Sequence, residues 1–205
     1  MEIIETVVRR DGWAVDLRLS QMKLSRKGLL IARDVAMQER ANATAFHCSN
    51  APGTFSYHHG TWAIRNHFVD KDWAVCRLDG IEGIRNDSLK IKVAFSNVDL
   101  ACDDNHIPKP RSEKGAGAER AASGGLFDYL PHYAPAPTDD VALYYLMVDQ
   151  DGASELTRPL VSNGTFITPL ERIYLSSGAD DGDGAAILEN DEIADGFDPQ
   201  VARKA

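Results

Sequence analysis

VALYYLMVDQDGASELTRPLVSNGTF, residues 141–166, is the stretch that decides the fold. Val141–Val148 is an apolar run of strand length, and Ser154–Val161 resumes a strand after an Asp-Gly turn signal. An Asn-Gly pair at 163–164 is a strong signal for a two-residue hairpin, and Thr165 begins a third strand. The stretch therefore predicts a three-strand antiparallel meander in the C-terminal part of the fold.

The residues that follow this meander change character twice. Thr168–Glu171, TPLE, fits a capping box with proline at the first helical position, so we expect a short helical turn towards Leu175. Beyond Gly178 the composition shifts to Asp, Gly and Ala, which predicts a poorly ordered, acidic tail over 179–205. That tail has a net charge of −6, and the rest of the chain only −3 of the total −9. Overall acidity is therefore a weak argument against a nucleic-acid partner.

The most regular helical pattern covers Leu29–Phe46, where apolar residues form a stripe opposite charged ones. Ser25 is its expected N-cap, and Asn50–Gly53, NAPG, is expected to end the element. We therefore expect one main helix, at about 29–46, packed on a largely antiparallel sheet. This arrangement belongs to the α+β class.

Upstream of the meander, apolar alternation predicts further strands. Trp13–Leu19 alternates apolar and charged residues, and Asp72–Leu78 and Leu89–Val98 repeat the pattern. Phe55–Val69 fits a strand followed by a helix as well as two short strands. Met1–Arg10 fits a helical face as well as a buried strand. Both alternatives stay open.

The chain of 205 residues is expected to form a single globular domain over 1–178. A long irregular excursion at 99–140 is expected to leave this domain from the edge of the sheet. No apolar run approaches the roughly 18–20 residues that a membrane span needs, and the N-terminus lacks the features of a signal peptide. Three widely spaced cysteines are typical of reduced thiols. These features predict a cytoplasmic protein without a membrane partner.

The run KPRSEKGAGAERAASGG at 109–125 carries four cations and no large apolar side chain. It is either a flexible connection or a segment that becomes ordered on a ligand, and its cations and free N–H groups favour an anion. It departs from the P-loop pattern and from the dinucleotide-binding pattern, so neither motif is assigned. The predicted anion-binding residues are Lys109, Arg111, Lys114, Gly115, Gly117 and Arg120.

A second hypothesis is a nuclease-like hydrolase that depends on a divalent metal. Its catalytic residues would be Asp79, Glu82, Asp87 and Lys90, with Mg²⁺ as the cofactor. Such enzymes usually place an acid two residues before the lysine on the same strand, and here Ser88 holds that position. The alternative is that these residues have no catalytic role and form the charged rim of a hairpin.

A third hypothesis is an inhibitor whose acidic tail mimics phosphates and occupies the basic cleft of a partner protein. No resident metal site or cofactor is predicted, because the histidines and cysteines do not have the spacing of paired metal ligands. The leading hypothesis is a small cytoplasmic binding or regulatory protein. It would contact an anionic ligand, nucleic acid being one candidate, through the basic Gly-rich loop. Whether the protein is also an enzyme, and whether it has a protein partner, stays open.

Overall fold

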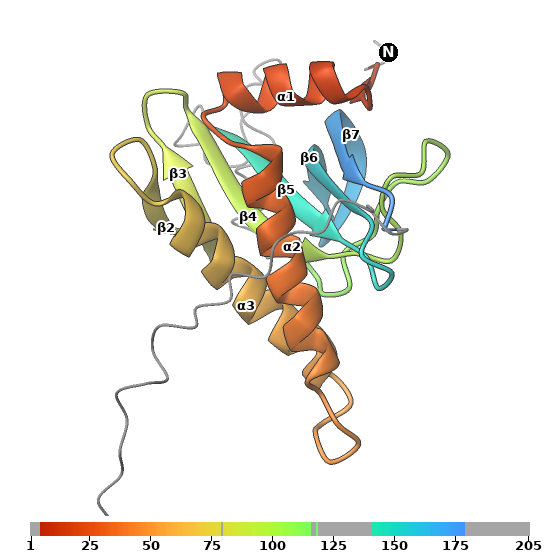
Figure 1. The fold of residues 1–205 in the computed structure, drawn as a ribbon. Helices are drawn as coiled ribbons and strands as arrows, with labels where there is room; N and C mark the ends of the chain where they lie inside the picture. The colour runs from red at the N-terminus through yellow and green to blue at the C-terminus, as the bar shows by residue number, and fades with distance from the viewer. Residues whose placement is uncertain (1–4, 79, 116–117, 119–140, 179–205) are drawn as a thin grey trace, which may run out of the picture.

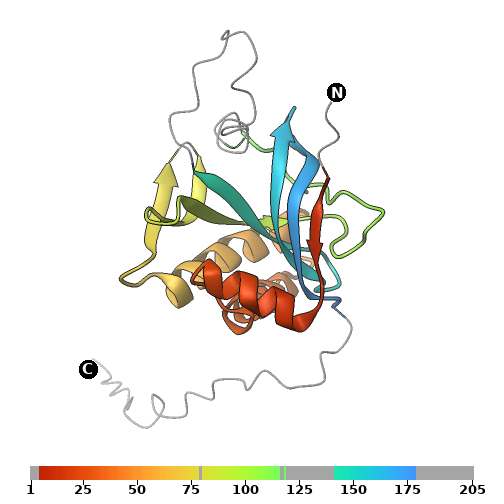
Figure 2. The ribbon, with the colours of Figure 1, turned by 90° about the horizontal axis from the view of Figure 1, so that it is seen from above.

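The computed structural model describes residues 5–78, 80–115, 118 and 141–178. These residues form a seven-stranded mixed sheet with the strand order β1-β7-β6-β5-β4-β3-β2, accompanied by three helices. The helices lie together on one side of the sheet (Figures 1 and 2). The mixed α+β class is thereby confirmed. The elements are β1 (Val7–Arg9), α1 (Gly12–Gln21), α2 (Arg26–Ala41), α3 (Ala51–Phe68), β2 (Ala74–Leu78), β3 (Ile81–Asn86), β4 (Ile91–Asn97), β5 (Ala142–Val148), β6 (Ser154–Ser162) and β7 (Thr165–Ser176).

The C-terminal meander is present as predicted, with β5-β6-β7 paired antiparallel. Asn163 and Gly164 have φ values of 52° and 74°, the two positive angles that the expected Asn-Gly hairpin turn requires. The predicted helical turn at Thr168–Glu171 is wrong, because β7 continues through these residues. Their backbone pairs with β6, and this ladder outweighs the local capping preference.

The strands β4 and β5 are parallel neighbours near the middle of the sheet. A parallel pair needs a crossover connection, so the excursion at 99–140 joins two central strands. The expectation that it leaves from the sheet's edge is wrong. A second parallel pair, β1 with β7, places the N-terminal strand at one edge of the sheet, and β2 forms the other edge.

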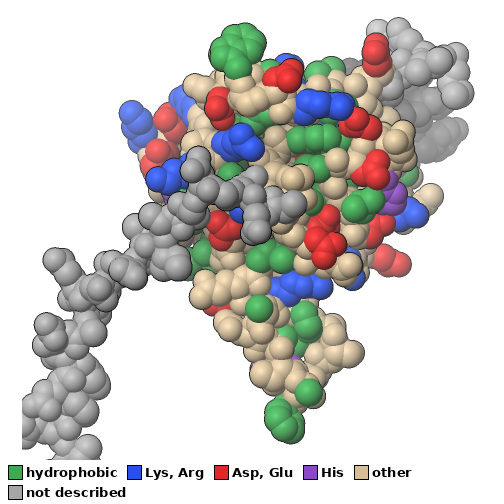
Figure 3. All heavy atoms as spheres, turned by 45° about the vertical axis from the view of Figure 1, so that its right-hand side comes forward, with side chains coloured by type: hydrophobic (Ala, Val, Ile, Leu, Met, Phe, Trp, Pro, Cys, Tyr) green, Lys and Arg blue, Asp and Glu red, His purple; other side chains and the backbone are tan. Residues whose placement is uncertain are grey.

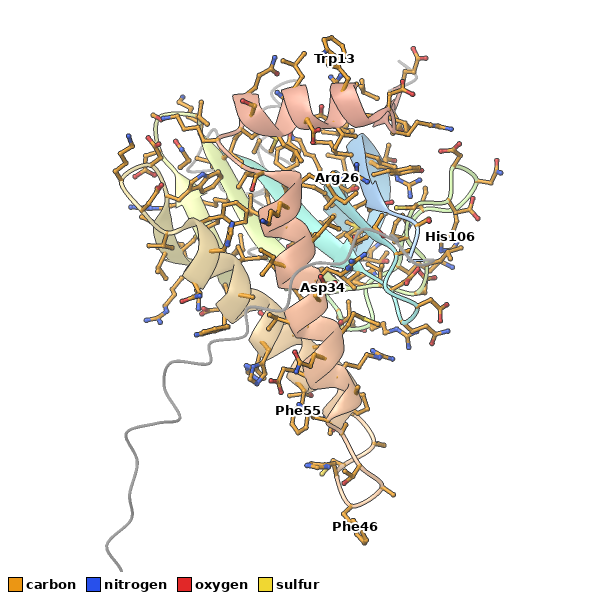
Figure 4. All side chains as sticks on the ribbon, in the orientation of Figure 1. Trp13, Arg26, Asp34, Phe46, Phe55 and His106 are labelled. Atoms are coloured by element: carbon orange, nitrogen blue, oxygen red, sulfur yellow. The ribbon has the colours of Figure 1, made fainter. Side chains whose placement is uncertain are left out.

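The strand predicted at Trp13–Leu19 is wrong, because the segment forms α1. Val15, Leu19 and Met22 recur at helical spacing and are buried at 0–1% exposure. Trp13, in contrast, is 77% exposed, and it projects away from the body of the molecule (Figure 4). The alternating apolar residues of this segment thus include both buried and exposed side chains. The exposed ones made the spacing resemble that of a strand.

Three helices are present in the described part of the chain where one main helix was expected. The Ser25 Oγ caps α2 by accepting a hydrogen bond from the Gly28 N–H, as predicted. The helix α2 ends at Ala41, and Phe46 lies in the exposed turn beyond it (Figure 4). Asn50–Gly53 was expected to end a helix, and in the structure it also begins α3, with proline in the first turn.

The sheet is covered on both faces. One buried cluster packs between the sheet and the three helices, and a smaller cluster on the opposite face includes Val98 and Ala101 from the segment after β4. This segment is held by a buried ion pair between Glu155 and Arg172, which are 0% and 3% exposed at the side chain. The Arg172 guanidinium donates to the Asp103 carbonyl, and the Cys102 N–H donates to Glu155. The start of the excursion is therefore tied to β6 and β7.

A second polar cluster fixes the N-terminal elements. The Glu171 carboxylate on β7 accepts hydrogen bonds from Arg9, Arg18 and Tyr144, each at 2.7–2.9 Å. Burial raises the pKa of this carboxyl, but the hydrogen bonds from Arg18, Arg9 and Tyr144 outweigh it and hold the pKa below its usual value. The charged Glu171 thus ties β1 and α1 to the sheet.

Candidate anion-binding site

The candidate site lies where β3 and β4 separate. Their pairing runs from Asn86 opposite Ile91 to Gly83 opposite Ala94. Beyond this point Ile81–Glu82 pairs only with β2, and Phe95–Asn97 has no partner on β3. We call this opening the β3–β4 notch. Because one side of β4 is left without a neighbouring strand here, other segments can approach it.

The described part of the basic loop, residues 109–115, approaches β4 at this notch. Pro110 forms an isolated antiparallel bridge with Val98, and the Arg111 N–H donates to the Asn97 carbonyl at 3.0 Å. Further along, the Lys114 N–H donates to the Gly164 carbonyl in the β6–β7 turn at 2.8 Å. Backbone hydrogen bonds therefore fix the path of this part of the loop and with it the positions of its cations.

A cavity of about 450 Å³ opens beside this loop, and we call it the arginine cavity. Arg40, from the last turn of α2, and Arg111, from the loop, both line it, together with the first turn of α3. Its lining contains no aspartate or glutamate among the residues that the structure describes. This surface is therefore locally positive on a chain whose net charge is −9. The lining residues are Arg40, Ser49, Asn50, Pro52, Gly53, Thr54, Tyr57, Asn97, Arg111 and Ser112.

Asn97, the last residue of β4, joins the elements that form this cavity. Its side chain donates to the Gly53 carbonyl at 2.9 Å and accepts from the Ser56 hydroxyl at 2.7 Å, which fixes the start of α3. The Arg111 guanidinium donates to the Val98 carbonyl and to the side chain of Gln150, both neutral acceptors. Its positive charge is thus not neutralised by a carboxylate in the described part of the chain.

A smaller cavity of about 130 Å³, the lysine cavity, adjoins the first, because Tyr57 and Ser112 line both. The Lys114 Nζ donates to the Ser96 Oγ at 2.9 Å and lies 5.2 Å from the ring centre of Tyr145 and 5.5 Å from that of Phe166. Burial lowers the pKa of the Lys114 ammonium to about 8. Two cavities therefore lie side by side at the notch, one lined by guanidinium groups and the other by an amine.

The other predicted anion-binding residues take different places. The Lys109 backbone bonds to Asp99, and Lys109 itself is exposed without lining either cavity. Gly115 lines the lysine cavity. Gly117 and Arg120 lie outside the described residues. The structure thus brings Arg111, Lys114 and Gly115 to the notch.

The residues of the hydrolase hypothesis are not brought together. Glu82 near the start of β3 forms an ion pair with Arg65, whereas Asp87 follows the end of β3 beside Arg85. Glu82 and Asp87 are five positions apart along an extended strand, a separation of about 16 Å that is too long for one metal ion. Lys90 lies in the turn with Asp87, with a φ of 52°, and Asp79 falls outside the described residues. No group of three or more potential metal ligands occurs in the described ranges.

Two parts of the arginine cavity did not enter the sequence-based prediction. Arg40 looked like one of several exposed charges on the polar face of a helix, and nothing in its neighbourhood marks it. The first turn of α3 carried a usable signal, since proline two residues after Asn50 is typical of a helix start.

Among the described residues, no helix has both the length and the apolar character that crossing a membrane requires. No family model, no curated protein and no solved structure matches this chain, so its fold and its cavities carry the functional argument alone.

Proposed function

We propose that the protein binds an anionic ligand in the arginine cavity. The observation that carries this proposal is that Arg40 and Arg111 line one cavity without any described carboxylate beside them. Guanidinium groups bind phosphate and carboxylate oxygens in a planar, bidentate geometry that a single neutral donor cannot offer. A volume of about 450 Å³ lies in the range of small-molecule sites.

The surroundings of the two arginines support the same ligand chemistry. The first turn of α3 lines the cavity, and the partial positive charge at a helix N-terminus favours an anion there. In this turn the Ala51 N–H donates to the Cys48 carbonyl and Pro52 has no N–H, so Gly53 supplies the N–H group that can reach a ligand. Ser49, Thr54 and Ser112 add hydroxyl groups to the lining. These groups suit a phosphate, whose oxygens accept several hydrogen bonds at once.

A phosphate within a single-stranded nucleic acid is the form of this ligand that the rest of the loop favours. Lys109 is exposed on the same segment as Arg111, two residues away, so a strand that continues beyond the cavity can meet a further cation. Tyr57 lines the cavity and offers an aromatic ring on which a base can stack. The predicted contact of Arg120 belongs to the same proposal.

The test measures binding of a fluorescein-labelled single-stranded oligonucleotide by fluorescence anisotropy over a series of salt concentrations. The parent protein is compared with Arg40→Ala, Arg111→Ala and the double variant. We expect each single change to weaken binding about tenfold, because each removes charge-assisted hydrogen bonds to a phosphate. Each lost phosphate contact should also reduce the log–log salt slope by about 0.7.

Arg77→Ala is the matched control, since it removes one arginine whose side chain is 72% exposed on the edge strand β2. This control should bind like the parent protein. Equal affinities for the parent and the Arg40→Ala/Arg111→Ala variant at low salt would contradict the proposal. Competition by inorganic phosphate against the oligonucleotide would show whether the phosphate group alone is recognised.

A further inference from the structure

Lys114 is the amine whose surroundings the proposed binding function leaves unexplained. Its Nζ lies beside the hydroxyl of Ser96 and over the rings of Tyr145 and Phe166. Glu82 and Glu113 line the same cavity, but neither forms an ion pair with this ammonium in the described part of the chain. A largely buried lysine without a carboxylate partner destabilises the charged form, so this position is costly for a merely structural residue.

We propose that Lys114 is a nucleophilic amine that forms an imine with an aldehyde whose anionic group is held in the adjoining arginine cavity. This inference rests on the proposed anion-binding function for the anionic half of the ligand. The proposed reaction of the Lys114 amine rests on the lysine cavity alone. The ligand class is thus a small aldehyde that carries a phosphate, and this phosphate would occupy the arginine cavity in competition with a nucleic-acid phosphate.

The arrangement of the two cavities supports a single ligand that reaches both. They share Tyr57 and Ser112, and their cationic side chains, Arg111 and Lys114, are three residues apart on one loop. The loop is fixed at both positions by backbone hydrogen bonds, to Asn97 and to Gly164. An anion bound at the arginines therefore places the rest of a small molecule towards the amine, which raises the effective concentration of its carbonyl group.

The environment of the amine favours the protonation state that this reaction needs. With a pKa of about 8, Lys114 has a neutral fraction near pH 7.5 that is on the order of a hundredfold larger than that of an ordinary exposed lysine. The groups that face it are the Ser96 hydroxyl, the rings of Tyr145 and Phe166, and the carboxylates Glu82 and Glu113 at the cavity wall.

The reaction needs no oxidant or reductant. The lone pair on the Lys114 Nζ attacks the carbonyl carbon, a C–N bond forms, and the carbonyl oxygen takes up a proton to give a carbinolamine. Loss of this hydroxyl as water, with the second proton of the amine, leaves the C=N bond. One aldehyde and one amine thus give one imine and one water.

The experiment uses pyridoxal 5′-phosphate as the probe and 5′-deoxypyridoxal as its matched partner, which lacks the phosphate and cannot close into a cyclic hemiacetal. After incubation with the full chain, borohydride reduces any imine to a stable amine, and peptide mass spectrometry locates the label. We expect Lys114 to be labelled first, and half-labelling by the phosphorylated probe to need about a tenfold lower concentration than by 5′-deoxypyridoxal. Labelling should rise with pH around a midpoint near 8.

Lys114→Arg should lose this fast label, whereas Lys109→Arg should keep it, because Lys109 lies on the same loop but is exposed. Arg40→Ala/Arg111→Ala should bring the phosphorylated probe down to the level of 5′-deoxypyridoxal. Circular dichroism verifies that each variant is folded.

Three outcomes separate the two halves of the inference. If Lys114 is labelled no faster than the exposed lysines while the oligonucleotide still binds through the arginines, the amine proposal is overturned and the binding function survives. If both probes label Lys114 equally, the anionic half of this inference fails, and the oligonucleotide titration decides separately whether the arginine cavity binds anions. Fast, phosphate-dependent labelling of Lys114 supports both halves.

Discussion

At the scale of single residues, the buried Arg172 and the partly buried Lys114 are charged groups with different hydrogen-bond surroundings. Arg172 is fully enclosed, and two of its nitrogen atoms donate to the Glu155 carboxylate while a third donates to backbone carbonyls after β4. Lys114 has one hydroxyl acceptor and two aromatic faces. Satisfied hydrogen bonds make the first group structural, whereas an ammonium without a described carboxylate partner is the observation on which the proposed reaction of Lys114 rests.

Arg172→Met should destabilise the fold by about 3–5 kcal/mol, because it leaves the Glu155 carboxylate buried and without its counter-charge. Urea denaturation of the parent and the variant measures this difference. The double variant Glu155→Leu/Arg172→Met removes both charges and should recover a large part of the loss. If the effects of the two substitutions on the free energy of unfolding simply add, so that the double variant is less stable than Arg172→Met, this account is contradicted.

Lys114→Met should raise the melting temperature at pH 7, since it removes an ammonium that burial disfavours. The pKa of Lys114 is about 8 in the folded state and 10.5 for an unperturbed lysine. Between these values the unfolded chain binds the proton and the folded chain does not, so the parent gains stability as the pH rises. The advantage of the methionine variant should therefore shrink from pH 8 to pH 10.5. A difference in melting temperature that is constant over this range would refute the argument.

At the scale of secondary-structure elements, close packing decides where the helices lie. The helix α3 contacts the sheet through Gly60, where a Cβ would stand 2.5 Å from the ring of Phe95, itself 1% exposed. The same helix also carries Gly53 in its first turn, where a Cβ would meet nothing within 4 Å. One helix thus offers two glycines, only one of which is required by packing.

Gly60→Ala should destabilise the protein by about 1–3 kcal/mol, because the added methyl group forces the ring of Phe95 or the helix to move. Gly53→Ala should be neutral or stabilise by up to about 1 kcal/mol, as alanine does in an open helix position. Thermal denaturation of the two variants provides the comparison. Equal effects of the two substitutions would show that α3 does not pack on the sheet at Gly60 as described.

At the scale of the whole molecule, charge is unevenly distributed. Figure 3 shows acidic and basic side chains interspersed over the described face, without a large area of one sign. The arginine cavity is a local exception, and residues 179–205 carry −6 of the total −9. Long-range repulsion of an anionic ligand is therefore expected to come mainly from these C-terminal residues.

Deletion of residues 179–205 leaves a chain with a net charge of −3 and should strengthen binding of the oligonucleotide severalfold at low salt. The gain should disappear near 1 M salt, where the screening length falls to about 3 Å. Anisotropy titrations of both chains provide the measurement. Weaker binding after the deletion would contradict this picture. Loss of a protein partner on deletion would instead support the inhibitor hypothesis.

The sequence predicted a helix or strand correctly where the residue pattern of the segment matched its environment in the folded protein. The meander β5-β6-β7 followed from its apolar runs and the Asn-Gly turn, because a hairpin is specified by neighbouring residues. The segment Trp13–Leu19 was assigned to a strand because its apolar residues alternate, and this was wrong because two of the four are exposed in α1. The start of α3 was taken only as the end of the preceding helix, since a proline can belong to either.

By itself the amino-acid sequence determined the α+β class, the C-terminal meander, the N-cap of α2 and the presence of a basic loop, because each depends on residues close together in the chain. Only the tertiary structure decided that β4 and β5 are parallel neighbours, that β3 and β4 separate at the notch, and that Arg40 and Arg111 line one cavity. These contacts join residues far apart in the chain, and long-range packing brings them together without leaving a local signal.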